Sequence, residues 1–151
     1  MKFTKMQGAG NDYVFIDART MDGDWPALAV AISDRHFGVG GDGIILVQDS
    51  DVAQLRMRIF NTDGSEGEMC GNGIRCLAKY AIERDLAQPG TEGITVETLA
   101  GVRTIQALKS QNVIVGARVA MGAPIFEPDL IPVELPRLSV TPVLEFPLEI
   151  A

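Results

Sequence analysis

NTDGSEGEMCGNGIRC, residues 61–76, is the most informative segment of this chain. It begins where an alternating segment ends, turns at Asp63-Gly64, and leads through CGNG into apolar residues at helical spacing. Cys70 therefore stands at the start of a predicted helix. Backbone N–H groups without helical partners and the positive end of the helix dipole lie there, and both stabilise a thiolate. The sequence leaves three roles open for this sulfur: nucleophile, metal ligand or proton-transfer base.

The flanking segments predict strands and two helices. Strands are expected at 3–8, 13–17, 44–47, 54–60, 94–99, 102–108 and 112–119, and helices at 25–35 and after Cys70. The side chains expected to face the core are Leu28, Ala31 and Ile32 on the first helix, Leu55, Met57 and Ile59 on strand 54–60, and Ile74, Leu77, Ala78, Ala81 and Ile82 on the second helix. Hairpins with two helices indicate the α+β class rather than a repeating βαβ fold.

The composition narrows the class of protein. A chain of 151 residues can form one domain with a core, and a net charge of −7 disfavours nucleic acid and anionic membranes as partners. The N-terminus does not resemble a signal peptide, and no apolar run reaches membrane-spanning length. Two cysteines then indicate reduced thiols and a cytoplasmic location rather than a disulfide framework.

Proline divides the chain into two regions. Six of the eight prolines lie beyond residue 121. We therefore expect a domain over residues 1–120 and a proline-rich linker or tail over residues 121–151, because proline weakens regular secondary structure. The tail contains one strand-like segment, VLEF at 143–146.

Other patterns favour structural interpretations. GVGGDG at 38–43 matches a dinucleotide-binding fingerprint, but it follows a predicted helix and precedes a predicted strand, the reverse of the required order.

His36, the only histidine, is expected to interact with the end of the first helix, although pairing with Cys70 stays open. No metal site is predicted, because the cysteines and histidine lack a recurrent ligand spacing. Cys70 and Cys76 would lie roughly 9 Å apart along one helix, too far for a disulfide.

The residues beside Cys70 suit a small polar ligand. Gly71 and Gly73 leave backbone N–H groups open at the helix start, and Asn11 and Asn72 add neutral hydrogen-bonding arms for an amino or carboxylate group. The competing interpretation is a buried cysteine at an ordinarily capped helix start. Spacing alone leaves both interpretations open.

Four motifs in order resemble the diaminopimelate epimerase family: KMQGAGNDY at 5–13, RHFGVGGDG at 35–43, FNTDGSE at 60–66 and MCGNGIRC at 69–76. MGAPIF at 121–126 is similar to the segment that ends the first domain in that family. The resemblance implies a mixed or antiparallel β-sheet curled barrel-like around a central helix, with the active site between two such domains. It also implies cofactor-free, PLP-independent interconversion of LL- and meso-diaminopimelate, an amino-acid substrate of lysine biosynthesis.

The resemblance also assigns roles to residues. Cys70 matches the first catalytic cysteine of the family, and the positions that match substrate contacts are Asn11, Asn61, Gly71 and Asn72. Some members carry glutamine at the position of Gly43, so that contact is absent or replaced here.

The family requires a second cysteine on a second domain, and Cys76 cannot replace it because it follows Cys70 on the same helix. We therefore expect half of an active site, negligible activity of the chain alone, and dependence on the missing C-terminal domain or a second chain, with a homodimer as one arrangement.

Three alternatives remain. The chain could be a relative with the same fold, such as a proline racemase-like or 3-hydroxyproline enzyme. It could be a truncated or split module that binds a partner without chemistry of its own. It could also be a cysteine hydrolase or a peroxide-reacting thiol, which would form an acyl-enzyme or a sulfenic acid without stereochemical inversion.

Overall fold

The computed structural model describes residues 1–131, so the predicted strand-like segment 143–146 lies outside the described residues. Contacts divide the chain into two compact units, Met1–Met121 and Gly122–Ala151. The elements of the first unit are β1 (Thr4–Gly8), β2 (Asn11–Asp17), α1 (Trp25–Ser33), β3 (Gly43–Gln48), β4 (Leu55–Asn61), β5 (Glu66–Gly67), α2 (Gly71–Glu83), β6 (Ile94–Thr98), β7 (Gly101–Ser110) and β8 (Val113–Val119). The described part of the second unit contains a short 3₁₀ helix, Pro128–Leu130.

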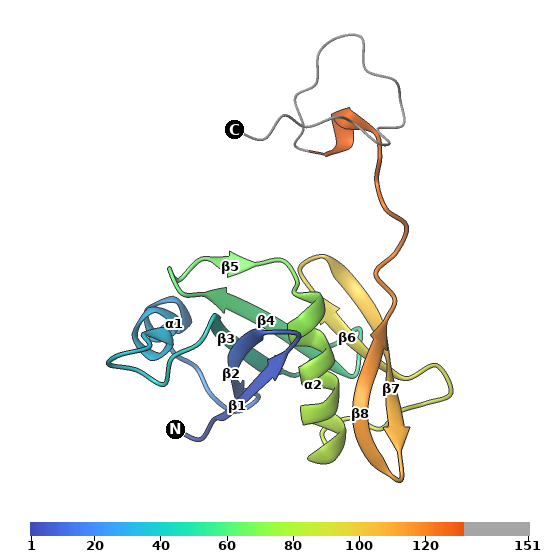
Figure 1. Cartoon of the computed structure of the whole chain (residues 1–151), viewed down its shortest axis with the longest axis horizontal. Coiled ribbons are helices and arrows are strands. Elements are labelled where there is room, and N and C mark those ends of the chain that lie inside the picture. Colours follow the sequence, from blue (N-terminus) through green and yellow to red (C-terminus); the bar gives the residue numbers. More distant parts are fainter. Residues whose placement is uncertain (132–151) are drawn as a thin grey trace. The chain divides into compact units, whose positions relative to one another are not determined.

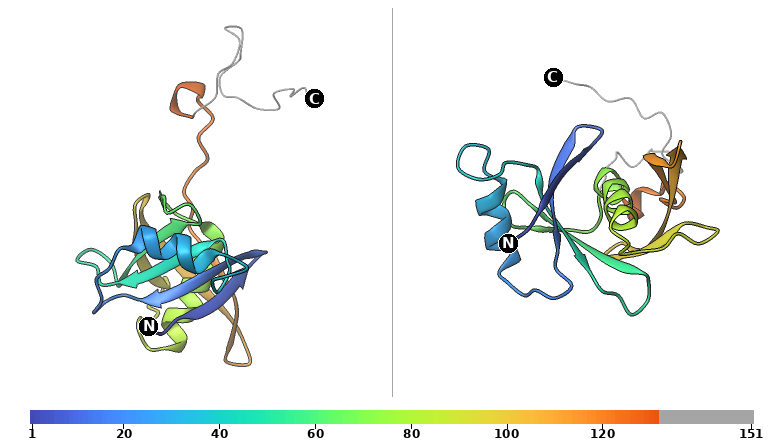
Figure 2. Two further views of the ribbon diagram at one scale, coloured as in Figure 1. Left: turned by 90° about the vertical axis from the view of Figure 1, so that its left-hand side faces the viewer. Right: turned by 90° about the horizontal axis from the view of Figure 1, so that it is seen from below.

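The strands form one mixed sheet in the order β1-β2-β3-β4-β6-β7-β8, with the short β5 paired to β4. Two pairings are parallel, β2 with β3 and β4 with β6, and the others are antiparallel. Both end strands, β1 and β8, contact α2, so the sheet curls around this helix (Figures 1 and 2). The architecture confirms the predicted α+β class with a curled sheet around a central helix.

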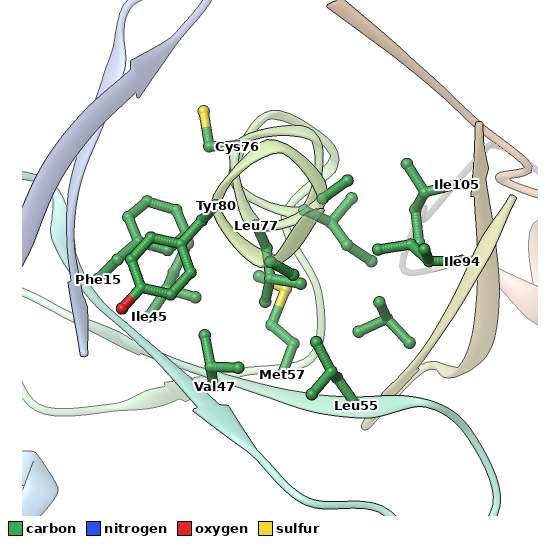
Figure 3. Close-up of a cluster of buried hydrophobic side chains, with 14 of the residues drawn as sticks. Phe15, Ile45, Val47, Leu55, Met57, Cys76, Leu77, Tyr80, Ile94 and Ile105 are labelled. Carbon is green, nitrogen blue, oxygen red and sulfur yellow. The ribbon is translucent and has the colours of Figure 1, made fainter. Parts of the chain in front are cut away.

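Helix α2 forms because its apolar side chains recur at helical spacing behind a glycine-rich start. Ile74, Leu77, Ala78 and Ala81 are fully buried, as predicted, while Ile82 is only partly buried. They pack against inward side chains of β2, β3, β4, β6 and β7 (Figure 3). Full burial of each large aliphatic side chain contributes about 1.5–3 kcal/mol, so this cluster accounts for much of the stability of the fold.

Helix α1 covers the opposite face of the sheet. The strands β2 and β3 are buried on both faces: Phe15 and Ile45 pack toward α2, whereas Val14 and Ile44 pack in a second cluster with Trp25 of α1. The strand β4 alternates as predicted, with Leu55, Met57 and Ile59 buried. The starts of β2 and β3 and the end of β4 thus lie at the same end of strands that are packed on both faces.

Two details of α1 differ from the prediction. The helix ends at Ser33 rather than Arg35, because the Asp34 carboxylate accepts hydrogen bonds from the backbone N–H groups of His36 and Phe37 and starts a turn. His36 thus lies three residues beyond the last residue of α1, rather than at the end of the helix, where it was expected. Ala31 is exposed, whereas Leu28 and Ile32 pack against the second cluster as predicted and are partly buried. The most buried positions of α1 are Trp25, Ala29 and Ser33, which recur every four residues.

Strand β2 begins at Asn11, two residues before the predicted strand 13–17. The turn between β1 and β2 is therefore only Ala9-Gly10, both at positive φ. The assignment of 121–151 as a linker or tail stays a prediction. None of the helices within residues 1–131 is long and apolar enough to cross a membrane.

Candidate active site

Cys70 is the N-cap residue of α2, and its half-buried sulfur accepts two hydrogen bonds. The backbone N–H of Gly73 donates to Cys70 Sγ at 3.3 Å, and the hydroxyl of Tyr13 donates to it at 3.5 Å. The first donor belongs to the same helix start, as the sequence predicted. The second comes from β2, and sequence reasoning missed it, because only the tertiary fold brings together residues 57 positions apart.

The two glycines after Cys70 differ in what the fold demands of them. A Cβ at Gly73 would lie 2.5 Å from Ile45 Cδ1, so any side chain there would displace Ile45 within the packed core. A Cβ at Gly71 would meet only the side chain of Met121, at 3.7 Å. Packing therefore does not explain Gly71, and its open backbone suits the close approach of a ligand.

Asn11 and Asn72 are brought together in a row of hydrogen bonds beside Cys70. Asn72 Nδ2 donates to Asn11 Oδ1 at 2.6 Å, and Asn11 Nδ2 donates to Asp42 Oδ2 at 3.1 Å. The guanidinium of Arg75 donates to Asn72 Oδ1. We call Asn11, Asp42, Asn72 and Arg75 the amide row. The side-chain NH₂ groups of Asn11 and Asn72 each have two N–H donors, and each uses one of them in the row. The second N–H of each group is then available to a ligand.

Asp42 gives the loop 38–43 a structural role. Besides Asn11, its carboxylate accepts the backbone N–H of Asp12 at 3.1 Å. The loop runs from α1 into β3, which is the order that argued against a nucleotide site. It fixes the orientation of Asn11 through Asp42, and no pattern in the sequence signalled this contact.

A small ion-pair network supports the amide row from outside. Arg35 bridges Asp12 at 2.7 Å and Asp42 at 2.9 Å, and Lys5 lies 3.1 Å from Asp12. Hydrogen bonds from Arg35, and then from Lys5, hold the pKa of the Asp12 carboxyl well below its usual range. Asp12 therefore stays ionised and keeps β1, β2 and the loop 38–43 linked by charge.

Asn61 lies near this site but outside the amide row. It ends β4, is exposed, and pairs in register with Gly43 at the start of β3. Its Nδ2 donates to Ser65 Oγ at 3.0 Å, so its recorded partner belongs to the turn after β4. The fold thus places Asn11, Gly43 and Asn61 at the same end of three adjacent strands, and the recorded side-chain hydrogen bond of Asn61 goes to Ser65 rather than to the other two.

Gly43 cannot carry a side chain in this backbone. Its φ is +144°, and a Cβ would lie 2.1 Å from the carbonyl oxygen of Phe60. A glutamine contact at this position is therefore excluded by the local geometry.

The other candidate groups lie elsewhere. Cys76 is buried and belongs to the core cluster around α2 (Figure 3), and burial raises the pKa of its thiol. It borders a hollow of about 430 Å³ between β1, α2 and β8 that does not include Cys70. His36 is exposed and shares no hydrogen bond with Cys70. Within residues 1–131, no group of three or more His, Cys, Asp or Glu residues could hold a metal ion.

Comparison with known proteins identifies related sequences and folds. The profile of the family described as "Diaminopimelate epimerase" matches residues 3–127. A diaminopimelate epimerase of Caldanaerobacter subterraneus subsp. tengcongensis is 50% identical over 135 residues, which cover 89% of this chain and 48% of that protein. The enzyme of that name from Moorella thermoacetica is 49% identical over 152 residues, covering 99% of this chain and 53% of that protein.

A solved structure supports the fold alone. A probable proline racemase from Agrobacterium radiobacter superposes with a TM-score of 0.61 at 13% identity, covering 79% of this chain and 41% of that chain. The chain spans about half the length of the curated relatives that it matches.

Proposed function

The chain belongs to the diaminopimelate epimerase family, and from this premise we propose that it forms one half of a cofactor-independent amino-acid epimerase site in which Cys70 transfers the α-proton. The proposed reaction interconverts LL- and meso-diaminopimelate in cytoplasmic lysine biosynthesis. The observation that carries the proposal is the position of Cys70 Sγ, at a helix start with two hydrogen-bond donors and two residues before Asn72 of the amide row.

The chemistry explains why a thiol is placed there. Inversion of a stereocentre without a cofactor needs a base on one face of the α-carbon and an acid on the other. The α-proton is much less acidic than a thiol, so the site must stabilise the developing carbanion with preorganised dipoles. A thiolate at the start of α2 can remove the proton, and the thiol that results can return one in the reverse direction.

The polar groups around Cys70 suit the substrate's charged groups. In this proposal, the open backbone at Gly71 and the free N–H groups of Asn72 and Asn11 bind the carboxylate at the reacting carbon, where the helix dipole also favours negative charge. Asn61, at the same end of the neighbouring strands, contacts a part of the substrate farther from the reacting carbon. The row fixes both amides before binding, which limits the ordering cost when substrate arrives.

The second acid–base group is proposed to come from outside these 151 residues. Cys76 is unsuited because it is buried, has a raised thiol pKa and follows Cys70 on the same helix. A C-terminal domain or a second chain, including a second copy in a homodimer, would supply this group and close the site. The isolated chain is then expected to have negligible epimerase activity.

The proposal can be tested by measuring α-deuterium incorporation from D₂O together with inversion, over a panel that includes LL-diaminopimelate, meso-diaminopimelate and proline. The isolated chain is compared with a form reconstituted with an epimerase C-terminal half. We expect turnover of diaminopimelate only in the reconstituted form, abolished by Cys70→Ser and retained by Cys76→Ser. Equal turnover by the isolated chain, or preference for proline, would overturn the proposal.

A further inference from the structure

Tyr13 brings a buried hydroxyl to the sulfur of Cys70. We propose that Tyr13 is a positioning residue that orients Cys70 Sγ and stabilises its thiolate form through the hydrogen bond at 3.5 Å. The inference rests on the proposed role of Cys70 in proton transfer. In this inference, a residue on β2 adds to the stabilisation that the N-terminus of α2 gives to the Cys70 thiolate.

The burial of Tyr13 makes the hydroxyl informative. The side chain is 6% exposed and its ring packs in the core cluster around α2, where phenylalanine would occupy nearly the same space. A buried hydroxyl without a partner is unfavourable, and Cys70 Sγ is the partner that the structure records within residues 1–131. Packing therefore explains the ring of Tyr13, and Cys70 explains its hydroxyl.

The two donors reach the sulfur from different elements. The N–H of Gly73 comes from the first turn of α2, and the O–H of Tyr13 comes from β2. Hydrogen bonds to an ionised acceptor are stronger than those to a neutral one, so both donors favour thiolate over thiol. Together they also limit the directions in which Sγ can point, because a side-chain rotation would lose at least one bond.

Burial and the neighbouring negative groups keep the Tyr13 hydroxyl protonated, so that it can act as a donor. Burial raises the pKa of Tyr13 far above its ordinary value, and the bond to Cys70 raises it further, as do the Asp42 and Asp12 carboxylates. Arg75 and Cys76 follow five and six residues after Cys70 on the same helix, and Cys76 lies near enough to interact electrostatically with both Arg75 and Cys70. The phenol thus remains protonated over the working pH range and can donate whenever Cys70 is ionised.

The direct test compares Tyr13→Phe with Tyr80→Phe. Tyr80 is equally buried, stacks on Phe15 with ring centroids 5.8 Å apart, and shares no hydrogen bond with Cys70. Iodoacetamide alkylation of the 151-residue chain is measured at pH 6.5 and pH 10, with modification of the Cys70 and Cys76 peptides resolved by mass spectrometry. We expect the Cys70 alkylation rate at pH 6.5, divided by the rate at pH 10, to fall several-fold in Tyr13→Phe, because less of the sulfur is then thiolate at pH 6.5. The same quotient should keep its wild-type value in Tyr80→Phe.

An unchanged ratio in folded Tyr13→Phe would overturn the inference, since a purely structural tyrosine would leave the balance of thiol and thiolate intact. A second measurement needs no change at Tyr13. In protein labelled with ¹³C at tyrosine Cζ, the Tyr13 signal should move over the pH range in which Cys70 gains alkylation rate, and this movement should vanish in Cys70→Ala. A Tyr13 signal whose pH dependence is the same in wild type and in Cys70→Ala would contradict the inference.

Neither measurement depends on turnover. The inference can therefore fail while the epimerase proposal stands, and a failed epimerase assay leaves these two results interpretable.

Discussion

The side-chain amide of Asn72 donates to Oδ1 of Asn11 at 2.6 Å and thereby joins the first turn of α2 to the first residue of β2. Sixty-one positions separate the two residues. The bond fixes two amides relative to Cys70 before any ligand arrives. Because Asn11 also donates to Asp42 and Asn72 accepts from Arg75, the orientation of each amide is determined by the whole row.

Replacing Asp42 tests whether the row orients Asn11. Asp42→Ala removes the acceptor for Asn11 Nδ2 and for the Asp12 N–H, so we expect a loss of about 1 kcal/mol in the free energy of unfolding. In a reconstituted enzyme, KM should rise about tenfold because Asn11 is then held only by its bond from Asn72 and is less firmly oriented. Asp42→Asn keeps an acceptor oxygen and should lie between the two. Equal KM values for all three proteins would show that Asp42 does not position Asn11.

The two glycines of the CGNG segment should separate stability from function. Gly73→Ala places a Cβ 2.5 Å from Ile45 Cδ1 in the core, and such overpacking costs about 1–3 kcal/mol, more than alanine gains in a helix. Gly71→Ala meets only Met121 at 3.7 Å, so urea unfolding should show wild-type stability. In the reconstituted enzyme, Gly71→Ala should nevertheless weaken substrate binding. The reverse order of stabilities would contradict the packing argument.

Gly43 should tolerate no side chain. Gly43→Ala combines a φ of +144° with a Cβ 2.1 Å from the Phe60 carbonyl oxygen, and we expect a loss of about 4 kcal/mol or more. Gly10→Ala is the matched control, because Gly10 has a φ of +95° with nothing within 4 Å of its Cβ. It should lose only about 1–2 kcal/mol from the left-handed backbone. Thermal unfolding of both variants measures the difference, and equal losses would mean that the close contact relaxes at little cost.

The Asp12 ion pairs predict a pH-dependent contribution to stability. Arg35 and Lys5 lower the pKa of Asp12 in the folded chain, so the contribution is complete above the ordinary carboxyl pKa and is lost as pH falls below it. Asp12→Asn should cost about 0.5–1 kcal/mol at pH 7, because these pairs are partly exposed. Urea unfolding should show this difference narrowing toward pH 3 and in 1 M salt. A difference that persists at low pH would indicate lost packing instead of lost charge.

Local patterns predicted several elements well. The alternation of 54–60 identified the buried face of β4, and the apolar spacing after Cys70 identified the core face of α2. Prediction was weaker where an end depends on one polar contact: α1 stops at Ser33 because Asp34 accepts two backbone N–H groups. It was also weaker where a face depends on the partner, as with Ala31, which the sheet does not cover.

Like the fold, the candidate site has features that follow from neighbouring residues and features that depend on tertiary contacts. Cys70 at the helix start and the open backbone of Gly71 followed from neighbouring residues, because a helix start and a glycine turn are local features. The roles of Tyr13 and Asp42 did not, because each acts through a partner far away in the chain. By itself, the sequence determined a thiol at the start of a core helix. Only the curl of the sheet around α2 decided which donors surround that thiol and how the two amides beside it are held, since these contacts join segments that only tertiary packing brings together.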